Sequence, residues 1–463
     1  MKMIYIGGGY VGACSAAVSA DSGHEVLVYD VDKEKVKNLS SNNKDIIEFA
    51  LFEDGLGELI TRNKARINFS SSYVKVESML DEARVVFMCL PTPEKGGSGE
   101  TDMSYYESAA KELAVAMAKR NNGKQTNYVL IINKSTVPIE TIGLTEEIMK
   151  SAGVKNFGVG SNPEFLVEGK AIDGSIKPSR IVVGAWKERD FKIFREAYNR
   201  FYNNTSVSFI ETNPIESAAG KLLANYILFN RLANTFDVVG RTCESFDKIK
   251  YEKVKSVIVS DNRIGDWGFF DSLFAGGSCF IKDSRSLAHQ LSQRGQNVDL
   301  VNNTLLANER QLNNFLWRAE TDLSYKWEGK KIGLLGLAFK RDTNDVRNSP
   351  ALTITDYLAD KGIAEIRAYD PVASDNYLKH YEKNELIKKI TVTDNEIDAI
   401  KGMDVIIIVT DWPQFRGLND VIKENLPVGA LVMDGRRMLQ HKFDELAEAG
   451  YAVLSVGSPI LKK

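Results

Sequence analysis

A glycine-rich turn near the N-terminus constrains the fold more than any other feature of the sequence. It follows the apolar run Met3–Ile6, which predicts a strand, and precedes the alanine- and serine-rich residues 13–20, which predict a helix. The turn reads Gly7-Gly8-Gly9-Tyr10-Val11-Gly12, with glycines in the G-x-G-x-x-G arrangement. Such glycines allow a tight turn and a close approach of the backbone to a ligand. The stretch therefore predicts the start of a dinucleotide-binding α/β fold.

A second predicted strand, Glu25–Tyr29, completes this pattern and ends at Asp30. In such units the pyrophosphate binds backbone N–H groups at the helix N-terminus, and an acid at the end of the second strand binds the adenosine ribose hydroxyls. A carboxylate at this position repels a ribose 2′-phosphate, so Asp30 favours NAD over NADP. The alternative is that Asp30 is an ordinary solvated carboxylate at a strand end.

Further strands of a parallel sheet are predicted, and polar loops follow them. Ala83–Leu90 runs into Pro91-Thr92-Pro93, and Tyr128–Ile132 runs into residues 133–138. Open α/β sheets bind their ligands at the carboxyl ends of the strands. These two loops are therefore candidates for ligand contacts.

The segment Ser161–Gly169 follows another short apolar run and carries two acids. Glu164 and Glu168 would share one face if the segment were helical, because residues four apart are neighbours on a helix surface. By spacing alone, a solvated pair of surface acids is the favoured explanation.

Residues 213–244 give the longest helical pattern of the sequence. Leu222 and Phe229 follow the spacing of an apolar stripe, and Asn225 interrupts that stripe. Lys221 lies one turn from Asn225, where a lysine usually extends to solvent and only sometimes has a function. We expect this helix to connect two α/β lobes and to offer an apolar surface for a homodimer.

A second α/β lobe is predicted after a polar linker near residues 320–330. Its glycines Gly333 and Gly336 lack the full fingerprint, so it need not bind a dinucleotide. Basic residues follow its strand ends, where a phosphorylated ligand would lie: Lys340, Arg341, Arg347, Arg436 and Arg437. The predicted strands are Lys331–Leu337, Glu365–Tyr369, Asp404–Thr410, Ala430–Met433 and Ala452–Val456, with a helix over residues 351–360.

A glycine pair followed by a thiol marks the stretch between the two lobes. Gly276 and Gly277 precede Ser278-Cys279, and Lys282 and Asp283 come soon after. A cysteine is a nucleophile as the thiolate, which nearby cations stabilise. A lone cysteine is more often a small buried residue. The nucleophile interpretation therefore depends on the dinucleotide site that precedes this stretch.

Length, charge and composition exclude several classes of protein. At 463 residues the chain should divide into two or three domains, and its net charge of −3 argues against nucleic-acid binding. Four scattered cysteines predict neither disulfides nor a metal site. The sequence shows neither a signal peptide nor a membrane span, so we expect a cytoplasmic protein. Because the four histidines fall outside every motif, acid–base chemistry is left to lysine, acids and the thiol.

Taken in order, the motifs resemble those of the nucleotide-sugar 6-dehydrogenases, the UDP-glucose/GDP-mannose dehydrogenase family. The resemblance covers nearly the whole chain. The matching stretches are residues 7–12, Lys134-Ser135-Thr136-Val137-Pro138, residues 162–169, Lys221-Leu222, Ala224-Asn225, Arg263-Ile264-Gly265, residues 276–279, Lys282-Asp283 and Gly336-Leu337-Ala338-Phe339-Lys340.

The resemblance implies three domains and a homodimer. An NAD-binding Rossmann domain would span residues 1–205. A central helical domain with the long helix and the cysteine loop would span residues 206–325. A Rossmann-like domain that binds the nucleotide-sugar would span residues 326–463. The family often completes the substrate pocket across the dimer, so Arg263 is expected to serve the partner subunit.

The resemblance also implies a reaction, the NAD-dependent four-electron oxidation of C6 of UDP-glucose to UDP-glucuronate, a precursor of polysaccharides. Cys279 would form a thiohemiacetal and then a thioester, which splits one hard step into easier ones. Lys221 and Asn225 would stabilise the oxyanions, and Asp283 would act on water with Lys221. Glu164, Glu168 and Thr136 would order the hydrolytic water or position C6.

The binding residues that the resemblance implies fall into two groups. Cofactor contacts are expected from Gly7, Gly9, Tyr10, Val11, Gly12, Asp30, Lys35, Pro91, Thr92, Ser135, Thr136, Glu168 and Arg347. Substrate contacts are expected from Phe165, Leu166, Lys221, Asn225, Arg263, Phe274, Gly276, Phe339, Lys340 and Arg437.

Alternatives remain for the substrate and for the reaction. The triplet Arg263-Ile264-Gly265 favours UDP-glucose, whereas residues 272–275 depart from the usual family sequence on the loop that holds the sugar nucleotide. GDP-mannose and UDP-N-acetylhexosamines are therefore alternative substrates. A two-electron dehydrogenase of the β-hydroxy-acid type would need neither Cys279 nor a second α/β lobe. A non-catalytic nucleotide-sugar-binding protein would bind without turnover.

Overall fold

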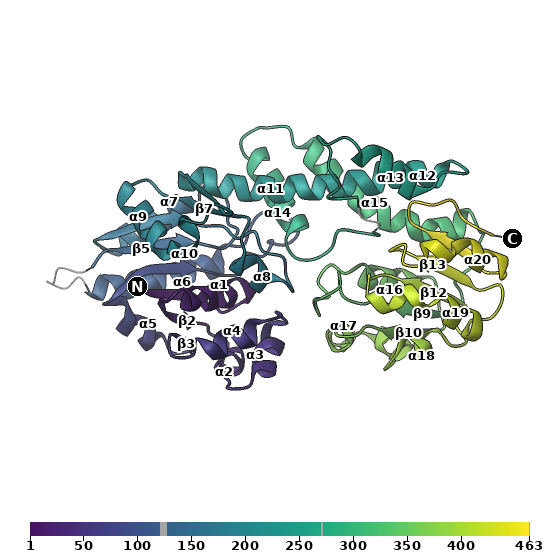
Figure 1. The fold of residues 1–463 in the computed structure, drawn as a ribbon, viewed down its shortest axis with the longest axis horizontal. Helices are drawn as coiled ribbons and strands as arrows, with labels where there is room; N and C mark the ends of the chain where they lie inside the picture. The colour runs from purple at the N-terminus through teal and green to yellow at the C-terminus, as the bar shows by residue number, and fades with distance from the viewer. Residues whose placement is uncertain (121–126, 270–271, 463) are drawn as a thin grey trace. The chain divides into compact units, whose positions relative to one another are not determined.

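The computed structural model describes residues 1–120, 127–269 and 272–462. Within these ranges the chain forms two compact units, each built around its own β-sheet (Figure 1). Unit 1 is made of Met1–Ala224 and Arg285–Gln296, and unit 2 of Asn225–Ser284 and Asn297–Lys463. The three-domain division expected from the sequence stays a prediction.

Unit 1 contains an eight-stranded sheet in the order β3-β2-β1-β4-β5-β6-β7-β8. Its neighbouring strands run parallel except β6 and β7, which are antiparallel. The strands are β1 (Lys2–Ile6), β2 (Glu25–Tyr29), β3 (Ile67–Ser70), β4 (Ala83–Met88), β5 (Val129–Asn133), β6 (Phe157–Ser161), β7 (Arg180–Gly184) and β8 (Ser208–Thr212).

Helices cover both faces of this sheet because successive side chains of a strand point to opposite faces. Met3 and Tyr5 of β1 pack in one buried cluster with residues of α1, α4, α8 and α9, whereas Ile4 and Ile6 pack in another with residues of α5, α6 and α7. The helices are α1 (Tyr10–Asp21), α2 (Lys33–Leu39), α3 (Lys44–Leu51), α4 (Leu56–Arg62), α5 (Tyr73–Leu80), α6 (Ser104–Arg120), α7 (Thr141–Ser151), α8 (Ala171–Ile176), α9 (Glu188–Ala197) and α10 (Asn199–Tyr202).

Unit 2 contains a six-stranded parallel sheet in the order β11-β10-β9-β12-β13-β14. This is the strand order of a dinucleotide-binding fold, and it also has helices on both faces. The strands are β9 (Lys331–Leu335), β10 (Glu365–Tyr369), β11 (Ile390–Val392), β12 (Val405–Ile408), β13 (Leu431–Asp434) and β14 (Ala452–Ser455). Its helices include α16 (Pro350–Asp360), α17 (Ser374–Tyr381), α18 (Glu396–Ile400), α19 (Asn419–Asn425) and α20 (Phe443–Glu448).

Two helices run from one unit into the other, α11 (Pro214–Asn234) and α14 (Phe280–Ser292). Unit 2 also contains α12 (Arg241–Ser245), α13 (Tyr251–Val259) and α15 (Asp299–Thr321). These elements and the two sheets confirm the predicted fold class, two Rossmann-like lobes with a long connecting helix. None of the helices in the described part of the chain is long and apolar enough to cross a membrane.

The structure corrects two details of the helical predictions. The regular helix predicted over residues 213–244 ends at Asn234 and continues as a π-helical turn, Thr235–Gly240, before α12. It is also shorter than α15, which has 23 residues against 21 for α11. The segment after β6 that carries Glu164 and Glu168 is not helical, so the two acids do not share a helix face.

Candidate active site

The glycine turn of unit 1 has a geometry that only glycine permits. Gly7 has a φ of +104°, and a Cβ there would lie 2.0 Å from the carbonyl oxygen of Cys89. A Cβ on Gly12 would lie 2.0 Å from the carbonyl oxygen of Gly7. At Gly9, by contrast, the described residues place no heavy atom within 4 Å of a Cβ. The turn is therefore packed on its inner side and open at Gly9, directly before α1, which fits a bound pyrophosphate.

Asp30, at the end of β2, is fixed against this turn. Its carboxylate accepts hydrogen bonds from the Gly8 backbone N–H at 2.7 Å and from the Lys35 ammonium at 3.1 Å, and its side chain is largely buried. The turn and the acid lie where β1 separates β2 from β4, the switch point at which such sheets bind ligands. A carboxylate at this point suits the ribose hydroxyls of NAD.

The loops after β4 and β5 are bonded to each other at the same edge of the sheet. Thr92 donates its hydroxyl hydrogen to the carbonyl of Thr136 at 2.8 Å, and Ser135 donates to the carbonyl of Leu90 at 2.7 Å. Pro91, between these partners, is exposed. The structure thus brings together four of the residues predicted to contact the cofactor: Pro91, Thr92, Ser135 and Thr136.

A buried ion pair forms the polar centre of unit 1. The Lys221 ammonium of α11 lies 3.1 Å from the Glu164 carboxylate, and the two side chains are only 5% and 7% exposed. The second oxygen of Glu164 accepts the backbone N–H of Leu166 at 2.5 Å. Lys221 therefore does not extend to solvent, as a surface lysine would. Burying this pair is costly, which makes Lys221 and Glu164 candidates for a functional role.

The aromatic ring of Phe165 lies close to two cations. The Arg180 guanidinium carbon is 3.9 Å from the ring centroid, and the Lys221 ammonium nitrogen is 5.1 Å from it. Such contacts are attractive because the face of the ring is electron-rich. They fix the ring of Phe165 beside the ammonium of Lys221.

A second polar centre lies in unit 2, around Asp283 of α14. One carboxylate oxygen accepts the Asn225 side-chain amide at 2.7 Å, and the other accepts the Lys282 ammonium at 2.5 Å. Asp283 is only 1% exposed. Its charge is thus paired, and the amide of Asn225 is oriented by it.

Cys279 lies directly before α14 and is partly exposed. Its carbonyl accepts the backbone N–H of Asp283 at 2.8 Å, which is the first hydrogen bond of the helix, and its sulfur lies 3.6 Å from the Ser278 hydroxyl. A helix N-terminus favours a thiolate because its N–H groups and dipole stabilise an anion. The other cysteines of the chain are buried. Cys279 therefore differs from them in the way expected of a nucleophile.

The glycine pair before Cys279 is required by the packing of Phe339. A Cβ on Gly277, whose φ is +82°, would lie 2.7 Å from the Phe339 ring. A Cβ on Gly276 would lie 2.4 Å from the carbonyl oxygen of Asn348. From α15, the side chain of Asn308 accepts the N–H of Ala275 at 2.7 Å and donates to its carbonyl at 3.2 Å. The cysteine loop is therefore held on both sides within unit 2.

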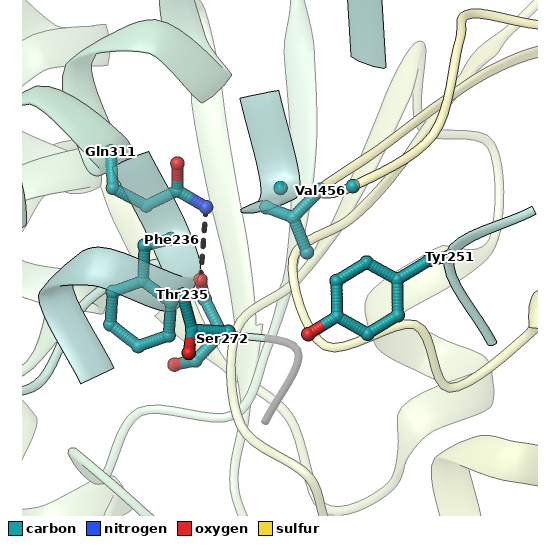
Figure 2. Close-up of a pocket in the computed structure, with 8 residues that line it drawn as sticks. Thr235, Phe236, Tyr251, Ser272, Gln311 and Val456 are labelled. Carbon is teal, nitrogen blue, oxygen red and sulfur yellow. Dashed lines mark hydrogen bonds between the residues drawn. The ribbon is translucent and has the colours of Figure 1, made fainter. Parts of the chain in front are cut away.

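The start of this loop borders a small cavity in unit 2 (Figure 2). Gln311 of α15 donates its amide hydrogen to the carbonyl of Ser272 at 3.1 Å, and the Arg436 guanidinium donates to the Ser272 hydroxyl at 2.7 Å. The cavity lies against the π-helical turn, an irregularity that is frequent at functional sites. It is lined by Thr235, Phe236, Gly240, Tyr251, Ser272, Gln311, Val456 and Gly457.

The switch point of unit 2 resembles that of unit 1, but a tryptophan contacts its acid. Asp370 follows β10 as Asp30 follows β2, and one of its oxygens accepts the backbone N–H groups of Leu337 and Ala338 at 2.7 and 3.1 Å. The same oxygen accepts the Trp412 indole N–H at 3.0 Å. Asp370 thus bonds the turn after β9 and the indole of Trp412, and whether this lobe binds a dinucleotide stays a prediction.

Comparison with known proteins identifies the family. Three models of the UDP-glucose/GDP-mannose dehydrogenase family match in succession: the NAD-binding domain at residues 1–202, the central domain at residues 216–310 and the UDP-binding domain at residues 333–441. The chain belongs to this family. The comparison thereby confirms the resemblance drawn from the motifs, and NAD is the cofactor of the N-terminal domain.

Curated relatives in the UDP-glucose/GDP-mannose dehydrogenase family are similar over their full length. A UDP-glucose 6-dehydrogenase of Rhizobium meliloti is 32% identical, with 99% of this chain and 100% of the relative covered. The UDP-glucose 6-dehydrogenase TuaD of Bacillus subtilis is 31% identical, with 100% and 94% covered. Among solved structures, a UDP-glucose dehydrogenase from Pyrobaculum islandicum superimposes with a TM-score of 0.85 at 27% identity, with 99% and 98% covered.

In this member of the UDP-glucose/GDP-mannose dehydrogenase family, the basic residues of unit 2 that were predicted to bind ligands differ in exposure and in their ion pairs. Arg263 and Arg347 are exposed, and each forms an ion pair with an acid two residues earlier, Asp261 or Asp345, at 2.6 Å. Arg437 is buried, has a φ of +50°, and its guanidinium pairs with Glu252 at 2.5 Å. A left-handed backbone is uncommon for arginine and points to a functional constraint.

Within each unit, the structure brings some of the predicted site residues together. Unit 1 pairs Glu164 with Lys221 and holds the glycine turn, Asp30 and Lys35. Unit 2 pairs Asn225 with Asp283 and packs Phe339 on the glycine pair. For other predicted site residues the structure gives the position in the fold, but their roles stay predictions. These residues are Tyr10, Val11, Thr136, Leu166, Glu168, Arg263, Phe274, Lys340, Arg347 and Arg437.

Sequence reasoning missed several residues that support the site of this dehydrogenase family member. Glu252 was missed because its partner, Arg437, is distant in sequence, and Asn308 was missed because it lies on a helix that no motif marks. Lys134 belongs to one of the family motifs, but the sequence assigns it no role of its own. Burial of these polar side chains, which a single sequence does not show, is the signal that finds them.

Proposed function

We propose that this protein is an NAD-dependent nucleotide-sugar 6-dehydrogenase that oxidises UDP-glucose twice at C6, to UDP-glucuronate. The observation that carries the proposal is the partly exposed thiol of Cys279 at the start of α14, one turn before the buried carboxylate of Asp283. A two-electron dehydrogenase would need no such nucleophile. The names of the curated relatives support UDP-glucose as the substrate.

In the proposed mechanism C6 loses one hydride in each oxidation, and NAD⁺, held at the glycine turn and Asp30, would supply the hydride acceptor. In the first, the C6 hydroxyl also loses its proton, and the alcohol becomes an aldehyde. The Cys279 thiolate adds to this aldehyde and forms a thiohemiacetal. Loss of the second hydride leaves a thioester, and water hydrolyses it to the carboxylate and the free thiol. Two molecules of NAD⁺ are therefore reduced for each sugar.

The residues of the chain stabilise charge and move protons in this scheme. Lys221 and Asn225, one turn apart on α11, donate to the oxygen on C6 when it carries negative charge. Asp283 holds the amide of Asn225 by a hydrogen bond and acts on the hydrolytic water. Glu164, which is paired with Lys221, acts together with Glu168 and Thr136. These three residues order the hydrolytic water or position C6.

A screen of NADH production tests the proposal. The purified protein is given NAD⁺ with UDP-glucose, GDP-mannose, UDP-N-acetylglucosamine or UDP-N-acetylmannosamine, and absorbance of NADH is followed. We expect the highest kcat/KM with UDP-glucose. A higher kcat/KM with another nucleotide-sugar would identify that sugar as the preferred substrate. Activity only with β-hydroxy acids would contradict the proposal.

Cofactor choice is expected to depend on Asp30. Replacing it with serine removes a charged acceptor, and losing one such hydrogen bond should lower kcat/KM for NAD⁺ about 10- to 100-fold. Discrimination against NADP⁺ should relax, because the repulsion of the 2′-phosphate is gone. Steady-state kinetics with both cofactors measures this, with the neighbouring helix cap variant Asp32→Asn as control. Equal wild-type kcat/KM for the two cofactors would contradict the assignment.

Arg437 is expected to bind the nucleotide-sugar. Arg437→Ala should raise KM for UDP-glucose about 10- to 100-fold, as loss of a charged donor does, and leave KM for NAD⁺ nearly unchanged. The exposed Arg416→Ala in the same unit is the matched control. Equal increases in the KM values for UDP-glucose and NAD⁺ would contradict the assignment of Arg437 to the substrate site.

A homodimer is also proposed. Large apolar side chains are exposed on three helices of unit 2: Ile227 of α11, Val257 of α13, and Leu300, Leu306 and Trp317 of α15. Exposed apolar side chains that gather in one patch are typical of a protein interface, and the proposal takes these five to form such a patch. Sedimentation velocity should give about twice the monomer mass, as a C₂ dimer requires. A monomer across the micromolar range would contradict the proposal.

A further inference from the structure

The loop between β6 and α8 carries Glu164 and Glu168 but has no regular secondary structure of its own. A loop without a hydrogen-bonded ladder must be held by other contacts if its side chains are to be precisely placed. In this chain two buried charged side chains from distant parts of unit 1, Lys134 and Glu53, contact its two ends.

Lys134 holds the beginning of the loop. It follows β5, and its ammonium donates to the Asn162 side-chain oxygen at 2.9 Å and lies 3.5 Å from the Asn162 carbonyl oxygen. Tyr198 donates its hydroxyl hydrogen to the same side-chain oxygen, and Asn162 donates its amide to the carbonyl of Val182 at 2.8 Å. Lys134 is only 6% exposed. Asn162 is thus fixed two residues before Glu164.

Glu53 holds the end of the loop. One carboxylate oxygen accepts the backbone N–H of Gly169 and the other that of Ala171, both at 2.9 Å. Glu53 is 1% exposed and lies more than a hundred residues earlier in the chain. Gly169 has a φ of +81°, so the loop turns sharply at the point that the carboxylate holds. This contact fixes the backbone directly after Glu168.

The electrostatics agree with this geometry. Burial lowers the pKa of Lys134, and the charge of Glu164 opposes that effect, so the two groups interact. Lys134 and Lys221 therefore both act on Glu164, the first through space and the second in direct contact at 3.1 Å. Burying a charged lysine or glutamate costs free energy unless the side chain forms strong hydrogen bonds. Lys134 and Glu53 both form such bonds with the loop.

We propose that Lys134 and Glu53 are positioning residues, which clamp the two ends of the loop 162–171 and so hold Glu164 against Lys221. The clamp acts through the loop and touches neither substrate nor cofactor. The inference rests on the proposed function in one respect, that Glu164 takes part in the reaction.

The experiment uses two variants and their matched controls. Lys134→Met keeps the length of the side chain but loses its charge and donors. Glu53→Gln keeps the shape but replaces one acceptor with a donor. The exposed Lys150→Met and Glu58→Gln, also in unit 1, are the controls. Thermal denaturation and NAD⁺ binding first establish that each variant is folded.

Two readouts separate positioning from stability alone. We expect kcat with UDP-glucose to fall about 10- to 100-fold in each variant, as for a displaced catalytic group, while KM for NAD⁺ stays within about twofold. In a double-mutant cycle with Glu164→Gln, the losses should not add, because both changes disable one group. A merely structural role would give additive losses.

Hydrogen exchange by mass spectrometry tests the clamp without catalysis. Peptides covering residues 162–171 should exchange faster in both variants than in wild type, and at the wild-type rate in both controls. Glu53→Gln removes one of the two oxygens that accept the Gly169 and Ala171 amides, and Lys134→Met releases Asn162 at the other end of the loop. If wild type reduces no NAD⁺ with any nucleotide-sugar, the proposed function fails while this readout still decides whether the clamp exists. Unchanged exchange, a kcat within twofold of wild type, or additive losses would each overturn the proposal.

Discussion

Replacing Cys279 with alanine should abolish formation of the uronic acid while both ligands still bind. In the proposed mechanism the thiol contributes a covalent bond to C6 and little affinity, so net turnover to the acid should fall roughly 10³- to 10⁶-fold, as for other enzymes that lose a nucleophile. Product analysis by liquid chromatography and binding of UDP-glucose and NAD⁺ by calorimetry measure the two effects. Cys243→Ala, a buried cysteine in the same unit, is the control and should keep full turnover per folded molecule.

Cys279→Ser extends this test to the intermediate. Serine keeps the size and the hydrogen bonding, but its hydroxyl is a much poorer nucleophile than a thiolate. A slow adduct that stops at the ester stage should accumulate and add the mass of the sugar nucleotide to the intact protein. If Cys279→Ala still forms the acid at a near wild-type rate, the covalent mechanism is wrong and Cys279 is a small structural residue.

Lys221→Ala is expected to impair both oxidations. In the proposed mechanism Lys221 supplies the positive charge for the oxygen on C6, and removing one preorganised donor of this kind lowers kcat about 10²- to 10³-fold. It also leaves Glu164 buried without its partner at 3.1 Å. Stopped-flow measurement of NADH formation should show slow first and second hydride transfers.

Two further measurements make this prediction specific. Glu164→Gln combined with Lys221→Ala should recover stability, because the unpaired buried charge is gone, but should not recover turnover. Added methylammonium should partly restore kcat by supplying a cation in the space that Lys221 leaves. A fall confined to the second hydride transfer would contradict a role in both oxidations.

The first unit was largely predictable because its signals are local. The strand, glycine turn, helix and acid from Met3 to Asp30 follow one another within a single unit, and each residue type has a physical reason to be there. Periodicity predicts the long helix but not its π-helical turn, because a π-helical turn leaves no distinct pattern in a single sequence. Short strands such as Ile390–Val392 gave too little pattern.

The site was predictable only as a set of residue types. The sequence contains Lys221, Asn225, Cys279 and Asp283, but nothing in their spacing shows that Lys221 is buried against Glu164 rather than extended to solvent. The contacts that hold the loop after β6 come from Glu53, far away in the sequence. Such pairings arise from tertiary structure, and a single sequence carries no record of them.

The number of NADH molecules formed per sugar tests the central claim most directly. Limiting UDP-glucose is converted to completion with excess NAD⁺ and wild-type protein, and NADH is counted by absorbance while UDP-glucuronate is counted by chromatography. The thiohemiacetal route requires about two NADH for each UDP-glucose consumed, with little free aldehyde. One NADH per sugar, with the aldehyde as the end product, would contradict the four-electron reaction and leave a simple two-electron dehydrogenase.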